Sequence, residues 1–318
     1  MAEAALRLVS PAEPTPRDRL DLAQIRAHPY ASSAYALALA AVGAPVDVSE
    51  WGSFVLERPI PGSSRTDAIG AYPFQVMGAR ADLEGGLERL RAKGLVSLVM
   101  VPDPLRGPPA SALSRVFPLC RPFKTHHLVG RWAGPYDPSR HHRERIRRGQ
   151  RRCRVEQVRL KDWIGPWKAL YAGLVDRRAI TGAAAFRPDY FDALAAEPRI
   201  TAFAALVEGE LAAMTLWFEH QGVVYNHLTA ANAQGYANSA SFALYDTALQ
   251  HFSEAVVANL GGGAGLIDDP EDGLAAFKRG FANTSIPALL CGAILDAQAY
   301  HGLAAGRAAV SYFPAYRS

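Results

Sequence analysis

A run of three strand-like segments joined by two-residue turns constrains the fold of this chain more than any other stretch. The segments are TAFAALV (201–207), LAAMTLWFE (211–219) and VVYNHLTA (223–230), all rich in aliphatic and aromatic residues. The turns between them, Glu208-Gly209 and Gln221-Gly222, have the short, glycine-containing form typical of tight hairpins. We therefore predict an antiparallel β-meander over 201–230.

Helical patterns and further strands surround this meander. Apolar residues from Phe242 to Phe252 recur at a spacing near 3.6, which predicts a helix over 238–255, and VVANL then predicts a short buried strand over 256–260. The remaining helices expected are one or two over 21–43, broken at His28-Pro29, and others over 82–94, 163–176 and 187–196. Strands are expected over 51–60, 95–103 and 285–296, a loop with a short strand over 67–78, and a strand pair around a proline turn over 116–132. We expect the first ~20 residues to form a loose arm.

The length and the charge content indicate a globular protein of two domains. A chain of 318 residues suits two compact units, which we place at 1–134 and 135–318 within a mixed α/β fold. No apolar run reaches the roughly 18 residues of a membrane span. The first residues also lack the pattern of a secretory signal, so we expect a cytoplasmic protein. The oligomeric state stays open.

Cysteine and histidine spacing gives no sign of a metal site. Cys120, Cys153 and Cys291 are widely separated and form no CxxC pair, and the nine histidines show no HExxH spacing. We expect no metal and no tightly bound cofactor.

Most of the positive charge lies in one segment. Residues 140–154 hold eight arginines and one glutamate, which leaves the rest of the chain slightly acidic against a net charge of +4. We expect a helix that begins at Asp137-Pro138-Ser139 with Asp137 as its cap, and that packs through a narrow stripe of Ile146, Gly149 and Cys153.

The arginines on the other sides of this helix suit phosphate binding. Arginine with so little acid to pair it favours phosphate contacts, although a charge run of this kind also occurs as a solvated face. No aromatic residues alternate with the arginines, so base stacking here is not expected. The residues predicted to bind phosphate or RNA are Arg143, Arg147, Arg148, Arg151 and Arg152.

The segment LGGGAGLIDDPEDGLAAFKRGF (260–281) places glycines directly before a short helix that ends in two cations. Asp269-Pro270 is expected to cap this helix, with Lys278 and Arg279 in its last turn. Gly261, Gly262 and Gly263 either allow a substrate to approach the backbone or form an ordinary turn. Lys278 likewise either contacts substrate or only complements the helix dipole.

The order of elements from residue 163 onward resembles the GNAT acyltransferase fold, and more specifically the Fem-type, twin-GNAT aminoacyltransferases. The resemblance rests on HHRERIRRGQRR, ANAQGYANSASFALYDTAL, NLGGG…DGLAAFKRGF and, in the first half, DAIGAYPFQV, and it covers roughly residues 20–300. It implies tandem GNAT-like domains and an enzyme that joins an acyl or aminoacyl group to an amine.

The resemblance also implies roles for particular residues. In a GNAT core two parallel strands splay apart and hold the donor; here these would be 223–230 and 256–260. Lys278 matches the family's lysine that supports the tetrahedral intermediate. Asn226 and His227 lie on the first of these strands, and His227 is either a general base or a structural histidine. Tyr72 and Asp67 match the family's Asp, Tyr and Pro loop and are expected near the substrate.

The loop at 234–239 bears on the identity of the donor. CoA-using GNATs carry a glycine-rich loop that cradles pyrophosphate, whereas this chain has Ala237 and Ser239 where glycines are expected. We expect Tyr236, Asn238 and Ser239 to contact the donor. Together with the arginine helix, this departure favours aminoacyl-tRNA as donor and the amine of a small molecule or a cell-wall precursor as acceptor. The alternatives are an acyl-CoA-dependent N-acyltransferase and a non-catalytic RNA- or nucleotide-binding protein on a GNAT scaffold.

Overall fold

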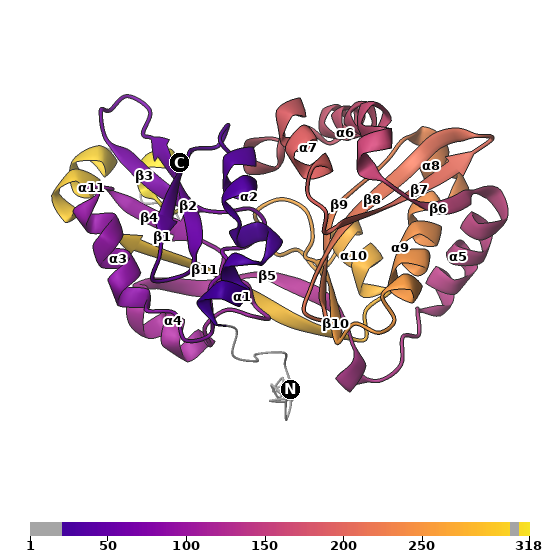
Figure 1. Cartoon of the computed structure of the whole chain (residues 1–318), viewed down its shortest axis with the longest axis horizontal. Coiled ribbons are helices and arrows are strands. Elements are labelled where there is room, and N and C mark those ends of the chain that lie inside the picture. The colour runs from indigo at the N-terminus through magenta and orange to yellow at the C-terminus, as the bar shows by residue number, and fades with distance from the viewer. Residues whose placement is uncertain (1–20, 306–311) are drawn as a thin grey trace, which may run out of the picture.

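A single mixed sheet runs through the whole molecule (Figure 1). The structure is a computed structural model that describes residues 21–305 and 312–318, so the predicted arm at the N-terminus lies outside the described residues. Across the described chain the sheet has eleven strands in the order β1-β2-β3-β4-β11-β5-β10-β9-β8-β7-β6. No helix in the described part of the chain is both long and apolar enough to cross a membrane.

The first half of the chain forms one end of the sheet. Its strands are β1 (Ala44–Val48), β2 (Ser53–Pro59), β3 (Thr66–Gly70) and β4 (Ser97–Met100), and its helices are α1 (Leu22–Arg26), α2 (Ser33–Ala38), α3 (Leu83–Ala92) and α4 (Ala110–Val116). The predicted break at His28-Pro29 is confirmed, because a short 3-10 turn over Pro29–Ala31 separates α1 from α2. The prediction missed β1.

The second half contains the predicted meander. It comprises β6 (Arg154–Val158), β7 (Ile200–Val207), β8 (Glu210–His220), β9 (Val223–Ala231) and β10 (Val257–Gly261), with helices α5 (Arg140–Arg152), α6 (Ile164–Arg178), α7 (Pro188–Ala195), α9 (Ala240–His251) and α10 (Gly273–Arg279). In both hairpin turns of the meander the two central residues have positive φ. That backbone matches the twist of the strands it joins and suits the glycine in each turn.

Two central strands connect the halves. β5 (Leu119–Gly130) lies between β11 (Thr284–Ile294) and β10, and β11 pairs in turn with β4 of the first half. The strand pair predicted over 116–132 is therefore wrong, because β5 is one continuous strand. Pro122 is tolerated within it since β10 pairs only with residues 127–130, so no neighbour on that side requires an N–H from residue 122. The boundary at 134/135 stays a prediction.

Three further expectations about local structure are wrong. Ser139 rather than Asp137 caps α5, and Asp272 rather than Asp269 caps α10, because in each case the side chain nearest the first turn accepts its N–H groups. Residues 233–238 form a short helix, α8 (Ala233–Asn238), where a loop was expected, since Asn232 caps it. A further helix, α11 (Ala297–Ala304), follows the strand β11.

The two faces of the sheet near β9 carry different layers. α5, α9 and α10 pack on one face, whereas α6, α7 and the N-terminal helices pack on the other. A register shift in the β8–β9 ladder leaves His227 without a partner residue, because Leu216 pairs with Leu228 and Trp217 with Asn226. Consecutive strand residues point to opposite faces, so His227 faces α6 and α7 while Asn226 faces α9. The bulge places Leu228 on the same face as His227.

Candidate functional site

The parallel pairing of β9 and β10 is short. It joins Val223 to Val257, Val224 to Ala258 and Tyr225 to Asn259, and ends there, although β9 continues to Ala231. Beyond this point the end of β10 meets the glycines of residues 261–263. The position agrees with the splayed strand pair that the resemblance implied.

Lys278 reaches this strand end from α10. Its side chain is buried, and its Nζ donates a hydrogen bond of 2.8 Å to the carbonyl oxygen of Gly262. Gly261 has a φ of +80°, and a Cβ at this position would lie 2.9 Å from Lys278 Nζ. The backbone conformation thus favours glycine here, and the absence of a side chain leaves room for the ammonium group. Burial lowers the pKa of Lys278 to about 8.

Lys124 and Asp272 fix the loop that follows the glycines. Lys124 Nζ donates to the carbonyl oxygens of Ala264 (2.7 Å) and Ile267 (2.5 Å). Asp272 Oδ1 accepts from the N–H of Ala264 at 2.9 Å, in addition to capping α10. Burial lowers the pKa of Lys124 as well. The loop is therefore tied to β5 on one side and to α10 on the other, which fixes the backbone around Lys278.

Asn259 and His126 complete this cluster. Asn259 is buried, and its Oδ1 accepts from the N–H of Gly261 (2.8 Å) and contacts His126 Nδ1 (3.2 Å). Asn259 Nδ2 has no hydrogen-bond partner among the described residues. Burial, reinforced by the charge of Lys278, lowers the pKa of His126 to about 3. We call Lys278, Gly261–Gly263, Asn259 and His126 the glycine-loop cluster.

The sequence analysis identified Lys278 and the glycines of this cluster but missed Asn259 and His126. A polar residue within the apolar run VVANL was the available signal for Asn259, since buried strands seldom carry an unexplained amide. His126 stands in a strand of mixed polarity and offered no comparable signal.

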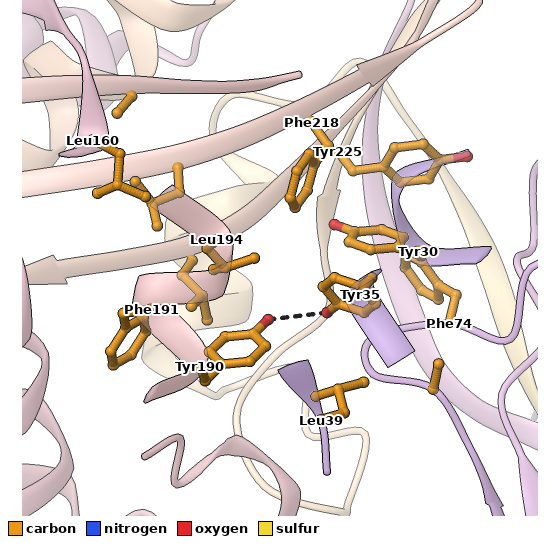
Figure 2. Close-up of a cluster of buried hydrophobic side chains, with 14 of the residues drawn as sticks. Tyr30, Tyr35, Leu39, Phe74, Leu160, Tyr190, Phe191, Leu194, Phe218 and Tyr225 are labelled. Atoms are coloured by element: carbon orange, nitrogen blue, oxygen red, sulfur yellow. Dashed lines mark hydrogen bonds between the residues drawn. The ribbon is translucent and has the colours of Figure 1, made fainter. Parts of the chain in front are cut away.

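His227 lies in a different polar cluster, built of tyrosines. Its Nδ1 is 3.1 Å from the hydroxyl of Tyr30 and its Nε2 is 2.6 Å from that of Tyr190. Tyr190 in turn contacts the hydroxyl of Tyr35 at 3.0 Å, as Figure 2 shows, and Tyr35 donates to the carbonyl oxygen of Tyr72 at 2.7 Å. We call these residues the tyrosine–histidine chain.

The last acceptor sets the direction of every hydrogen bond in this chain. Tyr35 gives its only hydroxyl proton to a carbonyl, so it accepts from Tyr190, which therefore accepts from His227 Nε2–H. His227 Nδ1 then carries the lone pair and accepts from Tyr30. Burial lowers the pKa of His227 to about 3. Both ring nitrogens are occupied, which favours the structural interpretation of His227 over that of a general base.

Asn226 is not brought together with His227. It faces α9, where its Nδ2 donates to Thr215 (2.9 Å) and its Oδ1 accepts from Tyr245 (2.7 Å). The separation follows from the alternation of side chains along a strand, which sends adjacent residues of β9 to opposite faces of the sheet.

The two residues predicted from the first half lie in different places. The Tyr72 ring is 6.1 Å from that of His227 and 5.0 Å from that of Phe186, so it borders the tyrosine–histidine chain. Burial raises its pKa to about 12. Asp67 lies on β3, separated from β10 by three strands, and its buried carboxylate pairs with Arg58 and Arg317. Its ion pairs account for Asp67 structurally, and the structure does not place it with Lys278.

The segment expected to contact the donor is covered on one side by α5. Tyr236 is exposed, with the Arg177 guanidinium 5.1 Å above its ring. Asn238 donates to the carbonyl of Gln234 (3.0 Å), and Ser239 is buried with a φ of +63°. A Cβ on Gly149 of α5 would lie 2.6 Å from the Ser239 carbonyl oxygen. α5 therefore packs directly against the start of α9.

The arginines of α5 fall into two groups. Arg143 pairs with Asp137 (2.6 Å), and Arg148 donates to the carbonyl of Ala237 (2.9 Å), so both already have partners within the chain. Arg147, Arg151 and Arg152 are exposed and form no ion pair or hydrogen bond with residues that the structure describes. The predicted stripe of Ile146, Gly149 and Cys153 is buried as expected. Three unpaired guanidinium groups thus face solvent on the outer side of this helix.

The cysteines and the acidic side chains form no evident metal centre. Cys120, Cys153 and Cys291 are free. Within the described ranges no group of three or more His, Cys, Asp or Glu side chains is arranged to hold a metal ion.

Comparison with solved structures identifies the fold. The chain superposes on FemX with a TM-score of 0.61, 12% identity and coverage of 89% of this chain and 96% of FemX. It also superposes on the C-terminal domain of a protein assigned as a lysylphosphatidylglycerol synthetase from Agrobacterium fabrum, with a TM-score of 0.59, 15% identity and coverage of 87% and 92%. For L-PGS from Bacillus licheniformis the values are 0.53, 13%, 83% and 91%.

The sequence itself matches no protein-family model and no curated protein. The similarity to FemX, to the synthetase domain and to L-PGS is therefore one of fold. It confirms the predicted mixed α/β class and the predicted resemblance to Fem-type proteins at the level of the fold.

Proposed function

We propose that this protein is an amide-bond-forming transferase that moves an aminoacyl group from aminoacyl-tRNA to the amine of a small molecule or of a cell-wall precursor. The observation that carries the proposal is the buried ammonium group of Lys278, held beside Gly261 and Gly262 where the pairing of β9 and β10 ends. Fem-like architecture supports the reaction class, since FemX shares this fold over most of both chains.

The chemistry requires alignment and charge stabilisation. The amine nitrogen attacks the ester carbonyl carbon, a carbon–nitrogen bond forms, and the carbonyl π electrons move to the oxygen. When this oxyanion collapses, the carbon–oxygen ester bond breaks, and the ribose oxygen leaves with the proton that the amine gives up. Lys278 stabilises the oxyanion, because a cation in a buried site acts more strongly than one in water. With a pKa of about 8 it is mostly protonated at neutral pH.

The position of α5 supports a tRNA donor. His142 of α5 contacts the carbonyl oxygen of Phe277 through Nε2 at 2.8 Å, which joins α5 to α10 one residue before Lys278. Arg151 lies nine residues further along, roughly 13 Å at 1.5 Å per residue. Phosphates near the end of an RNA could therefore contact the unpaired arginines while its terminal ester approaches Lys278.

An acyl-CoA donor is the competing interpretation. The segment that would cradle its pyrophosphate is folded as α8, and the Ala237 and Ser239 carbonyls face the packed surface of α5. The segment thus differs from the glycine-rich loop whose backbone N–H groups cradle pyrophosphate. It favours the tRNA donor, and with it a cytoplasmic location.

The donor can be identified directly with purified protein. In a mixture of ATP, tRNA, aminoacyl-tRNA synthetases and candidate amines, we expect an amide product whose formation stops on RNase treatment. Full activity with acyl-CoA alone, unaffected by RNase, would assign the CoA reaction instead. Binding of tRNA without product from any donor would indicate a non-catalytic RNA-binding protein.

A further inference from the structure

The orientation of the Asn259 amide is fixed by its neighbours. A backbone N–H only donates, so the atom that contacts Gly261 N at 2.8 Å is the amide oxygen. The same oxygen contacts His126 Nδ1 at 3.2 Å, which therefore carries a proton. Nδ2, with its two N–H groups, must point away from both contacts.

This leaves a buried donor without an acceptor. Asn259 is only 2% exposed, and Nδ2 is among the buried side-chain atoms that have no partner in the described chain. A buried donor in this state costs free energy, so it requires an explanation, and a catalytic role is one of the recognised ones. By contrast, the amide of Asn226 on the neighbouring strand β9 has partners for both its nitrogen and its oxygen.

Asn259 and Lys278 flank the same glycine. The Gly261 N–H donates to Asn259, and a Cβ on Gly261 would almost touch Lys278 Nζ. Lys278 Nζ uses one of its three protons on Gly262 and has further donors for a ligand. Both side chains therefore lie next to the same residue, which bears no side chain of its own.

We propose that Asn259 Nδ2 and Lys278 Nζ donate together to the oxyanion of the transfer reaction, so that Asn259 is a second catalytic residue. The inference rests on the proposed function and deepens it. As the carbon–nitrogen bond forms and the carbonyl π pair moves to oxygen, that oxygen receives one hydrogen bond from each donor. When it collapses and the ester oxygen leaves with the amine proton, both hydrogen bonds weaken.

His126 serves as a positioning residue in this arrangement. Its Nδ1–H and the Gly261 N–H hold the Asn259 oxygen from two directions, which prevents the amide from flipping. Burial and the Lys278 charge lower the pKa of His126 to about 3, so it stays neutral and donates to Asn259 over the whole physiological pH range.

Two substitutions separate donation from a structural role. Asn259→Asp retains the oxygen that holds Gly261 and His126 but removes the Nδ2 donor, whereas Asn259→Ala removes both. If Asn259 donates to the oxyanion, both variants should lower kcat by roughly 10²–10³ and leave KM within a factor of about three. Asn259→Ala carries no charge, so agreement between the variants excludes charge repulsion as the cause.

A structural role gives a different pattern. In that case Asn259→Asp keeps the wild-type kcat, Asn259→Ala lowers the midpoint of thermal unfolding, and the assignment of Asn259 is overturned. Wild-type protein that transfers no aminoacyl group at all would overturn the proposed function, and this inference with it, before any variant is made. Active wild type with both variants near the wild-type kcat would overturn the Asn259 assignment alone.

Discussion

The two polar clusters near the ends of β9 and β10 are both buried, yet they differ in how their hydrogen bonds are completed. In the tyrosine–histidine chain every donor from Tyr30 to Tyr35 has an acceptor, and the chain ends on the Tyr72 carbonyl. In the glycine-loop cluster Asn259 Nδ2 has no partner among described residues, and Lys278 uses one donor on Gly262. Complete hydrogen bonding suits the structural role that we assign to the first cluster, and the free donors beside the glycines suit the substrate contacts that we propose for the second.

The largest effect is expected at Lys278. Lys278→Met should lower kcat by roughly 10²–10³ with little change in KM, because its contact with substrate forms mainly in the transition state. Arg279→Met is the matched control, since Arg279 is adjacent, exposed, and donates to the Pro270 carbonyl instead. If both variants lost only a little kcat, and by equal amounts, the two cations would do no more than complement the dipole at the C-terminus of α10.

The tyrosine–histidine chain should respond in stability. Tyr190→Phe leaves the His227 Nε2–H and the Tyr35 oxygen without their partner, which should lower the free energy of unfolding by about 1–3 kcal/mol. Denaturant titration measures this loss, and Tyr236→Phe is the control because Tyr236 is exposed. A large fall in kcat for Tyr190→Phe with unchanged stability would show that the tyrosine–histidine chain takes part in catalysis.

The pKa of Lys278 predicts that the contribution of the glycine-loop cluster to turnover depends on pH. Because the ammonium form stabilises the oxyanion, the ratio of wild-type to Lys278→Met turnover should be constant below about pH 7 and fall roughly tenfold per unit above pH 8. A ratio that is flat from pH 6 to pH 10 would contradict a role for the charged form.

The lowered pKa of Lys278 also predicts how the free energy of unfolding changes with pH. The folded pKa lies below that of an unfolded lysine, so between about 8 and about 10.4 the unfolded state binds more protons. The penalty of burying the charge is complete below pH 8 and is relieved as the pH rises through this window. Lys278→Met should lack this rise when unfolding is measured against pH.

The smallest effect concerns the unpaired arginines. Changing Arg147, Arg151 and Arg152 to glutamine should weaken tRNA binding and make its salt dependence shallower, by ~1 in log–log slope for each phosphate that the variant no longer neutralises. The control removes three exposed arginines from the first half, Arg80, Arg91 and Arg115. If tRNA binding had the same salt dependence in both triple variants, the arginines of α5 would be only a solvated helix face.

Local patterns predicted part of this molecule well. The glycine-containing turns defined the meander, and the glycine run before Lys278 marked the strand end where the ammonium group lies. These features depend on residues close in sequence. The order β4-β11-β5-β10 depends on pairings between strands more than 120 residues apart, such as β5 with β10 and β11, which no local pattern encodes.

The side-chain partners were harder to predict for the same reason. His227 has the chemistry of a general base, and only the approach of Tyr30, from almost two hundred residues away, shows that its nitrogens are occupied. Asp67 matched a substrate loop in sequence, whereas Arg317 from the end of the chain neutralises it. The apolar run around Asn259 marked it as unusual in sequence, but only the packed structure shows that its Nδ2 has no partner among described residues.

One paired measurement tests most directly whether Lys278 acts in catalysis and His227 in stability. Single-turnover transfer rate and free energy of unfolding should be measured for Lys278→Met and His227→Gln in the same preparation. We expect Lys278→Met to lose rate but not stability, and His227→Gln to lose stability while its folded fraction keeps nearly the wild-type rate. The reverse pattern, with His227→Gln slow and Lys278→Met fast, would contradict both roles.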